Sequence, residues 1–251
     1  MNIEVHIITC NEQDILPYAL RHYATFASRI VIHDNASKDN TRAIATAAGA
    51  EIVDWPAGAD IDDRKLTAVK NGALVGCTAD WGIVVDADEF MYFPLGALAS
   101  FEAYEAQRVA VVKPYGFEMT SEAYPTTAGQ IYDEVKFGAR DDMWYAKPCI
   151  FAPKLVKDVG IGIGGHAADV LLHSGAVIHV ERDYPKSDPP CYLLHFHQIG
   201  PLDRIAKAYD DKHARMCENN IKSGWGNHEP GIKHAKDKRA FIMARLERVF
   251  P

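Results

Sequence analysis

Two aspartates and a glutamate follow directly on an apolar run in the first half of the chain. The run is residues 83–85 (IVV), and the acids are Asp86, Asp88 and Glu89. Three carboxylates at the end of a buried strand repel one another unless a cation, a hydrogen-bond donor or water offsets their charge. Two carboxylates two residues apart can both turn toward one hard cation. A solvated acidic turn is the alternative interpretation.

Polar side chains also follow two other predicted strands and open one predicted helix. These clusters are residues 9–12, 33–41 and 62–65. If the strands are parallel, all the clusters meet the acids at the carboxyl edge of the sheet, where open α/β sheets bind ligands. Each cluster alone could be a helix cap or a turn. Their common place at one edge favours a binding site.

The elements that position these residues follow from the hydrophobic periods. Strands are predicted over 3–9, 29–33, 51–54 and 81–85, and helices over 15–23, 40–48 and 64–77. This order predicts an α/β fold with a mostly parallel central sheet flanked by helices. Later we expect a central strand at 109–113, short strands and loops over 117–151, a strand over 192–196, and one or two surface helices after Pro201, separated near Pro230-Gly231.

Composition excludes several classes of protein. The 27 basic and 34 acidic residues give a net charge of -7, which argues against a general nucleic-acid binder. Five cysteines without a CxxC pair exclude a disulfide-stapled miniprotein or a zinc ribbon. No apolar stretch approaches the length of a membrane span, and Glu4 and His6 interrupt the first apolar run. We expect a soluble, cytoplasmic protein.

Four segments together resemble the GT-A glycosyltransferases, specifically family 2 with its short members. The segments are IITCNEQDILPYAL, VIHDNASKDNTRAIA, WGIVVDADEF with its Asp-x-Asp motif, and the later LLHFHQIGPLDRIAKAY with its His-aromatic pattern. The first two-fifths of the chain match well, and beyond Pro94 only the His segment does. The resemblance implies a GT-A-like layered fold with the nucleotide site at the carboxyl edge.

The resemblance also implies an activity, which is transfer of a sugar from a nucleoside diphosphate sugar to a hydroxyl acceptor with inversion. A divalent cation, Mn or Mg, would stabilise the charge that builds on the departing diphosphate. The implied nucleotide-sugar-binding residues are Thr9, Asn11, Glu12, Asp34, Asn35, Arg64 and Asp86. The implied metal ligands are Asp86, Asp88 and His195.

The division of labour along the chain follows from the same resemblance. A single domain over 1–251 would use residues 1–94 for the donor, 95–200 for the acceptor and the late metal histidine, and 201–251 as a helical tail. The acceptor would be a glycan, a lipid-linked molecule or a small molecule. The tail holds 11 basic and 7 acidic residues, so a peripheral membrane contact is conceivable, although mixed-charge helix faces are usually just solvated.

An inverting enzyme also needs a carboxylate base near the reactive carbon of the sugar. Asp141 and Asp142 are the first candidates, because they lie beside Trp144 and Tyr145, which could flank a sugar. An ordinary exposed loop explains both aspartates equally well. Glu118, just past the predicted strand 109–113, is the second candidate.

Two histidines alternate in the run from Tyr192 to Phe196 and beyond, so the side chains of His195 and His197 share a strand face. Two imidazoles on one face make a plausible metal site, while a lone strand histidine is more often structural. We select His195, with His197 and His166 in reserve.

Three competing interpretations stay open. Residues 160–165 match GxGxxG, but the dinucleotide fingerprint follows the first strand of a βαβ unit, so a turn is favoured here. VVDADEF could be the motif of haloacid-dehalogenase-type phosphatases with Asp86 as nucleophile, although Phe90 replaces the usual Thr or Val. A non-catalytic nucleotide- or sugar-binding module of the same fold is the third.

Overall fold

The central sheet is built around β1 (Ile3–Thr9), which pairs in parallel with β2 (Arg29–Asp34) and β4 (Trp81–Asp86). In the computed structural model, which describes residues 1–55, 58, 60–225 and 230–250, β3 (Glu51–Asp54) extends the parallel part beyond β2. Two-residue strands, β9 (Ile150–Phe151) and β6 (Val111–Val112), complete the sheet with antiparallel pairs beyond β4. The predicted α/β fold with a mostly parallel central sheet is confirmed.

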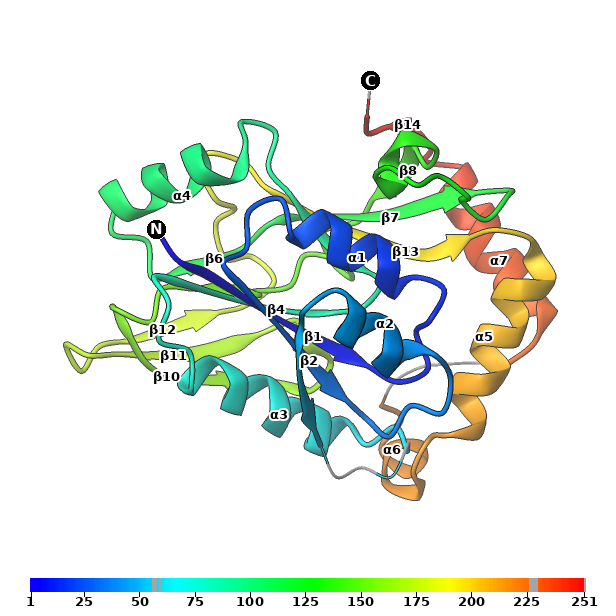
Figure 1. Ribbon diagram of the computed structural model, residues 1–251, viewed down its shortest axis with the longest axis horizontal. Helices are drawn as coiled ribbons and strands as arrows, with labels where there is room; N and C mark the ends of the chain where they lie inside the picture. Colours follow the sequence, from blue (N-terminus) through cyan, green and yellow to red (C-terminus); the bar gives the residue numbers. More distant parts are fainter. Residues whose placement is uncertain (56–57, 59, 226–229, 251) are drawn as a thin grey trace.

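Both faces of this sheet are covered, which explains why every residue of β1 is buried. On one face Ile3, Val5 and Ile7 pack with α1 (Leu16–Tyr23) and α4 (Ala97–Ala106) in the main core. On the other face Ile8 packs with α3 (Asp63–Val75) and a three-stranded sheet of β10 (Val156–Ile161), β11 (Ala168–Leu172) and β12 (Val177–Val180). Figure 1 shows α3 and this small sheet together on one side of β1 and β4.

A second sheet of five strands lies beside the first. Its order is β14 (Glu247–Arg248), β8 (Phe137–Arg140), β7 (Tyr115–Ser121), β13 (Tyr192–Ile199) and β5 (Glu89–Tyr92). Only Ala87 and Asp88 separate β4 in the first sheet from β5 in the second. The Ala87 amide donates to the carbonyl of Ile8 in β1 (3.2 Å), and the Phe196 amide of β13 donates to the carbonyl of Asp88 (2.9 Å). This turn therefore joins the two sheets.

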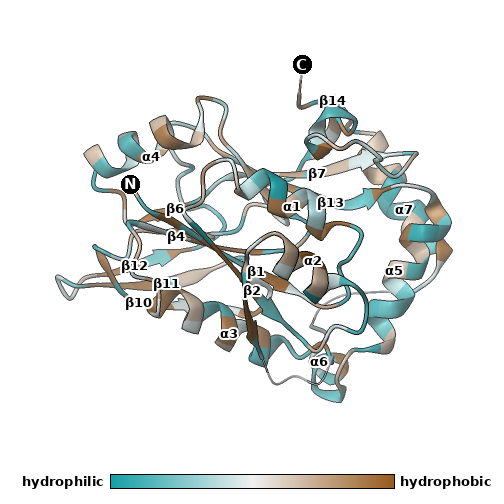
Figure 2. Cartoon of the chain, in the orientation of Figure 1, coloured by the Kyte–Doolittle hydropathy of each residue, from teal (hydrophilic) through white to brown (hydrophobic). Residues whose placement is uncertain are grey.

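Helices and short turns complete the chain. They are α2 (Thr41–Ala47), the 3₁₀ turns η1 (Ile131–Asp133) and η2 (Ile163–Gly165), α5 (Leu202–Ala214), α6 (Glu218–Ser223) and α7 (Ile232–Met243). Figure 2 shows hydrophobic central strands and more hydrophilic outer helices, α5 among them. None of the described helices has the length and apolar character that a membrane-spanning helix needs.

The predicted elements differ from the structure mainly after residue 100. The four early strands and three early helices are found with ends shifted by at most two residues. The expected central strand at 109–113 is wrong, because β6 holds two residues and lies at the edge of the sheet. Short strands and loops do occupy 117–151, and α7 begins directly after Gly231, whose φ of 94° suits glycine. Three helices follow Pro201 where one or two were expected, because the short α6 lies between α5 and α7. The GxGxxG stretch forms the end of β10 and η2, a turn as expected.

His22, on α1, is a titratable group in the main core. Its ring is 3% exposed, and it contacts the rings of Tyr23, Phe26, Phe90 and Tyr132. Nε2 lies 2.8 Å from the carbonyl of Met91, whereas Nδ1 has no hydrogen-bond partner among the described residues. Burial lowers the pKa of His22 from 6.5 to about 4.

We predict that acid weakens this fold through His22. The unfolded chain takes up a proton near pH 6.5 and the folded chain only near pH 4. The contribution of neutral His22 is therefore complete above pH 6.5 and is lost as pH falls toward 4, by up to about 3 kcal/mol. Denaturant unfolding between pH 7.5 and 4 measures this slope. His22→Gln should flatten it, whereas His173→Gln, at an exposed histidine, should not. Equal slopes in all three proteins would contradict the assignment.

Candidate active site

A cleft of about 620 Å³ opens at the carboxyl edge of the parallel strands. Its walls come from the ends of β1 and β4, the start of α3, the turn η2, β13 and α5. The lining includes Thr9, Asn35, Asp62, Asp63, Asp86, Asp88, Glu89, His166, His195, His197 and Lys212. The polar clusters predicted from four separate segments therefore do meet at one place. An adjoining cleft of about 560 Å³ shares Glu12, Asp88, His197 and Lys212 with it.

Buried cations balance two of the three carboxylates that follow β4. Glu89 is 2% exposed, and its Oε1 lies 2.6 Å from Nζ of Lys147. Burial alone would raise the pKa of Glu89, but the charges of Lys147, His195 and Lys70 outweigh it and hold that pKa far below its usual range. Asp86 lies 2.8 Å from Nζ of Lys70 and 3.8 Å from Nζ of Lys147. The repulsion expected between these acids is thus offset by lysines from α3 and from the loop before β9.

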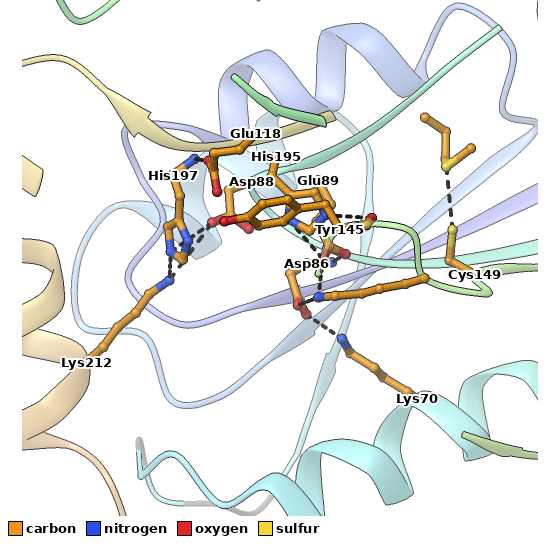
Figure 3. Close-up of polar contacts among 12 residues, drawn as sticks. Lys70, Asp86, Asp88, Glu89, Glu118, Tyr145, Cys149, His195, His197 and Lys212 are labelled. Atoms are coloured by element: carbon orange, nitrogen blue, oxygen red, sulfur yellow. Dashed lines mark hydrogen bonds and ion pairs between the residues drawn. The ribbon is translucent and has the colours of Figure 1, made fainter. Parts of the chain in front are cut away.

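Asp88 has different partners, on β13 and α5. Its Oδ2 lies 3.3 Å from Nε2 of His197 and 3.9 Å from Nζ of Lys212. Burial raises the pKa of Asp88, but the charges of His197 and Lys212 lower it to about 2. Lys212 also contacts the His197 ring nitrogen directly. Figure 3 shows Asp88, His197 and Lys212 converging at one point, apart from the pair of Asp86 and Lys70.

The two histidines of β13 lie in the same cleft, as predicted, but contact different acids. Nδ1 of His195 lies 3.6 Å from Glu89, and its Nε2 lies 3.2 Å from the carbonyl of Tyr145. His197 is the histidine that reaches Asp88. A register shift in the pairing of β13 with β7 falls between His195 and Gln198. Burial lowers the pKa of both rings, that of His197 to about 4.

Glu118, on β7, lies directly behind His197. Its Oε1 accepts a hydrogen bond from the His197 amide at 3.2 Å, and the Tyr145 hydroxyl bonds to the same carboxyl group. Glu118 is 2% exposed, and burial raises its pKa to about 8. Figure 3 shows Glu118, Tyr145 and His197 grouped around Asp88.

The residues expected to bind a nucleotide sugar divide into lining and supporting groups. Thr9, Asn35 and Glu12 line the main cleft, and Asn11 lines the adjoining one. Burial raises the pKa of Glu12 to about 8. The side chain of Asp34 is fully buried and supports the edge of the cleft through hydrogen bonds to its neighbours.

The carboxyl group of Asp34 accepts hydrogen bonds from Thr9 Oγ1 (3.3 Å), the Ser37 amide (3.1 Å) and Arg42 (3.0 Å). Asp34 thereby links the ends of β1 and β2 to the segment that leads into α2. The structure gives its carboxylate a positioning role at the edge of the cleft.

Arg64, Asp141 and Asp142 lie outside the two clefts, as does Glu118. Arg64, on the first turn of α3, has a side chain that is 59% exposed and contacts Asp62 at 3.7 Å. Asp141 accepts hydrogen bonds from the Met143 and Trp144 amides. Asp142 accepts from the Gly116 amide at 2.9 Å and from Arg140 at 2.7 Å. These contacts fold the loop that carries Trp144 and Tyr145.

Sequence reasoning missed the cations of the cleft. Lys70 is 8% exposed on α3, Lys147 lies in an irregular loop, and Lys212 follows the quoted His segment on α5. The lysine inside the quoted segment, Lys207, has a side chain that is 74% exposed and pairs with Asp211. Lys70 lies four residues from Leu66 and from Leu74, on the apolar face of the predicted helix. A lysine on such a face is unusual without a partner, and Lys70 could have been found from that position.

Comparisons with known proteins show partial similarity. No family model matches the chain. A TPR repeat-containing protein of Synechococcus elongatus is 30% identical over 151 residues, which cover 58% of this chain. The chain spans about a third of that relative's length, 34%.

Solved structures match about half of the chain. Glucosyl-3-phosphoglycerate synthase from Mycobacterium tuberculosis, in complex with Mn2+, uridine diphosphate and glucosyl-3-phosphoglycerate, matches with 18% identity and a TM-score of 0.34 over 45% of this chain and 43% of that chain. Mannosyl-3-phosphoglycerate synthase from Rubrobacter xylanophilus matches with 18% identity and a TM-score of 0.36 over 45% and 39%. These values identify neither the reaction nor the ligands of this chain.

We predict that the pair of Lys147 and Glu89 is required for stability. Lys147→Met would leave a buried carboxylate without its nearest cation, which should lower the free energy of unfolding by about 3–5 kcal/mol. Urea unfolding followed by circular dichroism measures the loss. Lys154→Met is the matched control, because Lys154 forms an exposed pair with Asp80, and it should change stability little. Similar losses in both variants would contradict a special role for Lys147.

Proposed function

We propose that this chain is a metal-dependent glycosyltransferase that moves a sugar from a nucleoside diphosphate sugar to a hydroxyl acceptor with inversion. The observation that carries the proposal is the group of Asp88, His197 and Lys212 at the carboxyl edge of the parallel sheet. Asp88 and His197 offer metal-ligand atoms, and Lys212 supplies a cation beside them. The group lies in the cleft where the four predicted polar segments meet. Lys70, Lys147 and Arg215 line the same cleft and add positive charge toward a diphosphate.

The donor set fits Mn or Mg bound together with phosphate. Asp88 Oδ2 and His197 Nε2, 3.3 Å apart, offer one carboxylate and one imidazole donor. Two protein donors suffice when phosphate oxygens and water complete an octahedral site. A bound divalent cation would stabilise the negative charge that develops on the departing diphosphate. Lys212 would then neutralise phosphate charge, and His195 would keep Glu89 and its lysines in place.

The other two predicted metal ligands, Asp86 and His195, have other roles in this proposal. His195 contacts Glu89 and the carbonyl of Tyr145, so we assign it to positioning Glu89. Asp86 is bound by Lys70 and Lys147, so we assign it to donor binding, through the ribose or the lysines. We assign the base and ribose of the donor to Thr9, Asn11, Glu12 and Asn35, with Asp34 and Arg64 at the margins. In this proposal residues 1–94 bind the donor and 95–200 face the acceptor.

The geometry favours Glu118 as the base that activates the acceptor hydroxyl. Glu118 is linked to Asp88 through His197. The backbone amide of His197 donates a hydrogen bond to Glu118, and its ring contacts Asp88. None of the three candidate carboxylates lines the two clefts, but Glu118 bonds to two residues that do, His197 and Tyr145. Asp141 accepts hydrogen bonds within its own loop, and Asp142 accepts from Gly116 and Arg140. The Tyr145 hydroxyl on Glu118 orients the carboxyl group.

We predict that nucleoside diphosphates stabilise the protein more with Mn than with EDTA. Ligand at about 100 times its Kd adds roughly 2.7 kcal/mol, and the cation strengthens binding of the phosphates. A thermal-shift screen of nucleoside diphosphates and nucleotide sugars measures the difference and identifies the base. Asp88→Ala should abolish the Mn dependence, and Asp210→Ala, at an exposed residue of α5, should retain it. Binding and turnover that EDTA leaves unchanged would refute the metal role.

We predict that Glu118→Gln lowers turnover about 10²–10⁴-fold while nucleotide binding persists. The variant keeps the shape of the side chain and removes the carboxylate form, the form that accepts a proton and that becomes the major one above a pH of about 8. Transfer or donor hydrolysis, measured with the donor found in the screen, gives the rate, and Asp141→Asn and Asp142→Asn are measured beside it. If one of those two shows the loss, the base lies in the loop. Phosphoester hydrolysis abolished by Asp86→Asn would favour a phosphatase, and binding without turnover a non-catalytic module.

A further inference from the structure

A second cluster of metal-ligand side chains lies away from the cleft, on the face of β1 that is turned toward α3. Glu4 and His6 come from β1, and Cys77 follows the end of α3. All three are buried, with exposures of 4%, 5% and 6%. One donor atom from each, a carboxylate oxygen, an imidazole nitrogen and the sulfur, lie within 4.8 Å of one another. His6 is three residues from the end of β1, about 10 Å from the edge that carries the cleft.

The ring of His6 has a contact at each of its two nitrogens. Nδ1 lies 2.9 Å from Nε2 of His33, a hydrogen bond that fixes the orientation of the ring. Nε2 lies 2.8 Å from Glu4 Oε1, its partner inside the cluster. These two atoms face each other, so a metal ion bound there would replace the proton that they share.

Glu4 is arranged in the same way. Its Oε2 lies 2.8 Å from Arg29, which also contacts Glu51 at 2.6 Å. Its Oε1 is the oxygen that faces His6. One atom of each side chain is therefore fixed by a neighbour outside the cluster, and the other atom points at the shared centre. Metal sites use this pattern, in which outer hydrogen bonds orient the ligands.

Gly82 on β4 provides the space for the sulfur. Glu4 and Gly82 are register partners in the pairing of β1 with β4. A Cβ at position 82 would lie 3.1 Å from Cys77 Sγ, closer than ordinary van der Waals contact. The absence of a side chain at Gly82 lets the thiol approach Glu4 and His6 from the α3 side of the sheet.

We propose that Glu4, His6 and Cys77 bind a structural zinc ion inside the sheet–helix interface, independent of the cation in the cleft. Imidazole nitrogen, thiolate sulfur and carboxylate oxygen are the three donors that zinc uses in proteins. Tetrahedral zinc places such atoms roughly 3–4 Å apart. The three atoms lie within 4.8 Å of one another, and Glu4 Oε1 and His6 Nε2, at 2.8 Å, would separate slightly to admit the ion. Binding converts the Cys77 thiol to thiolate and releases its proton to solvent.

The ion would fasten two parts of the chain that are far apart in sequence. β1 begins the central sheet, and Cys77 lies in the connection from α3 to β4. With zinc bound, the charges of Glu4 and the Cys77 thiolate are neutralised where they are buried. Zinc would therefore stabilise the folded chain, in addition to any effect of nucleotide or Mn.

Cobalt substitution in the full chain tests the proposal. We expect the chelator-treated protein to bind one Co2+ at this site with a sulfur-to-cobalt charge-transfer band in the near ultraviolet, and zinc to displace it and abolish the band. Cys77→Ala should remove the band. Glu4→Gln, which keeps the shape of the side chain, should weaken Co2+ binding at least about tenfold. Zinc should raise the melting temperature of the wild-type protein above that in EDTA.

Three controls separate this site from other thiols and from the cleft. Cys10→Ala removes the thiol that lines the cleft, and Cys149→Ala removes another buried free thiol. Both should retain the band, as should Asp88→Ala, so failure of the glycosyltransferase proposal leaves this one testable. No band in the wild-type protein, or a band that survives in Cys77→Ala, overturns it. If Cys77→Ala does not fold, an unchanged Co2+ affinity in Glu4→Gln overturns it equally.

Discussion

The ion pair between Lys147 and Glu89 is the interaction on which the geometry of the cleft depends. A carboxylate that is 2% exposed is tolerated only beside a cation. Its two oxygens do different work, because Oε1 takes Lys147 and His195 while Oε2 accepts the Asp86 amide at 2.9 Å. Glu89 thus stabilises the turn between β4 and β5 by accepting a hydrogen bond from the backbone of Asp86. Asp86 and Asp88 are then held at the mouth of the cleft, where α3 and α5 supply their cations.

The first half of the fold could be predicted because its strands are buried on both faces or end in polar turns. In 81–85 an apolar run, and in 3–9 an apolar run interrupted by Glu4 and His6, mark the strand, and the polar residues that follow mark the edge of the sheet. The strand at 109–113 failed for a physical reason. Val111 and Val112 are buried and apolar, but they pair only with the two residues of β9. The hydrophobicity of these two valines indicates correctly that they are buried, but it does not indicate whether their strand lies at the centre or at the edge of the sheet.

For the site, sequence patterns located the carboxylates and histidines but not their pairing. Alternation puts His195 and His197 on one face, yet the shifted register beyond His195 gives them different acids. Lys147 comes from a loop without period, and its contact with Glu89 joins residues 58 positions apart. The buried group of Glu4, His6 and Cys77 was invisible for the same reason. In sequence, Glu4 and His6 only interrupt an apolar run, and the lone cysteine has no neighbouring partner.

The two-residue connection between β4 and β5 has a mechanical consequence. Ala87 is bonded to the first sheet and the carbonyl of Asp88 to the second, so the chain crosses between them at one carboxylate. Tilting one sheet against the other would rotate this junction before it moved any other part of the cleft. A relative motion of the two sheets would therefore act on the turn that carries Asp88. A shift of β13 relative to the first sheet would act directly on the backbone of Asp88, whose carbonyl accepts a hydrogen bond from Phe196.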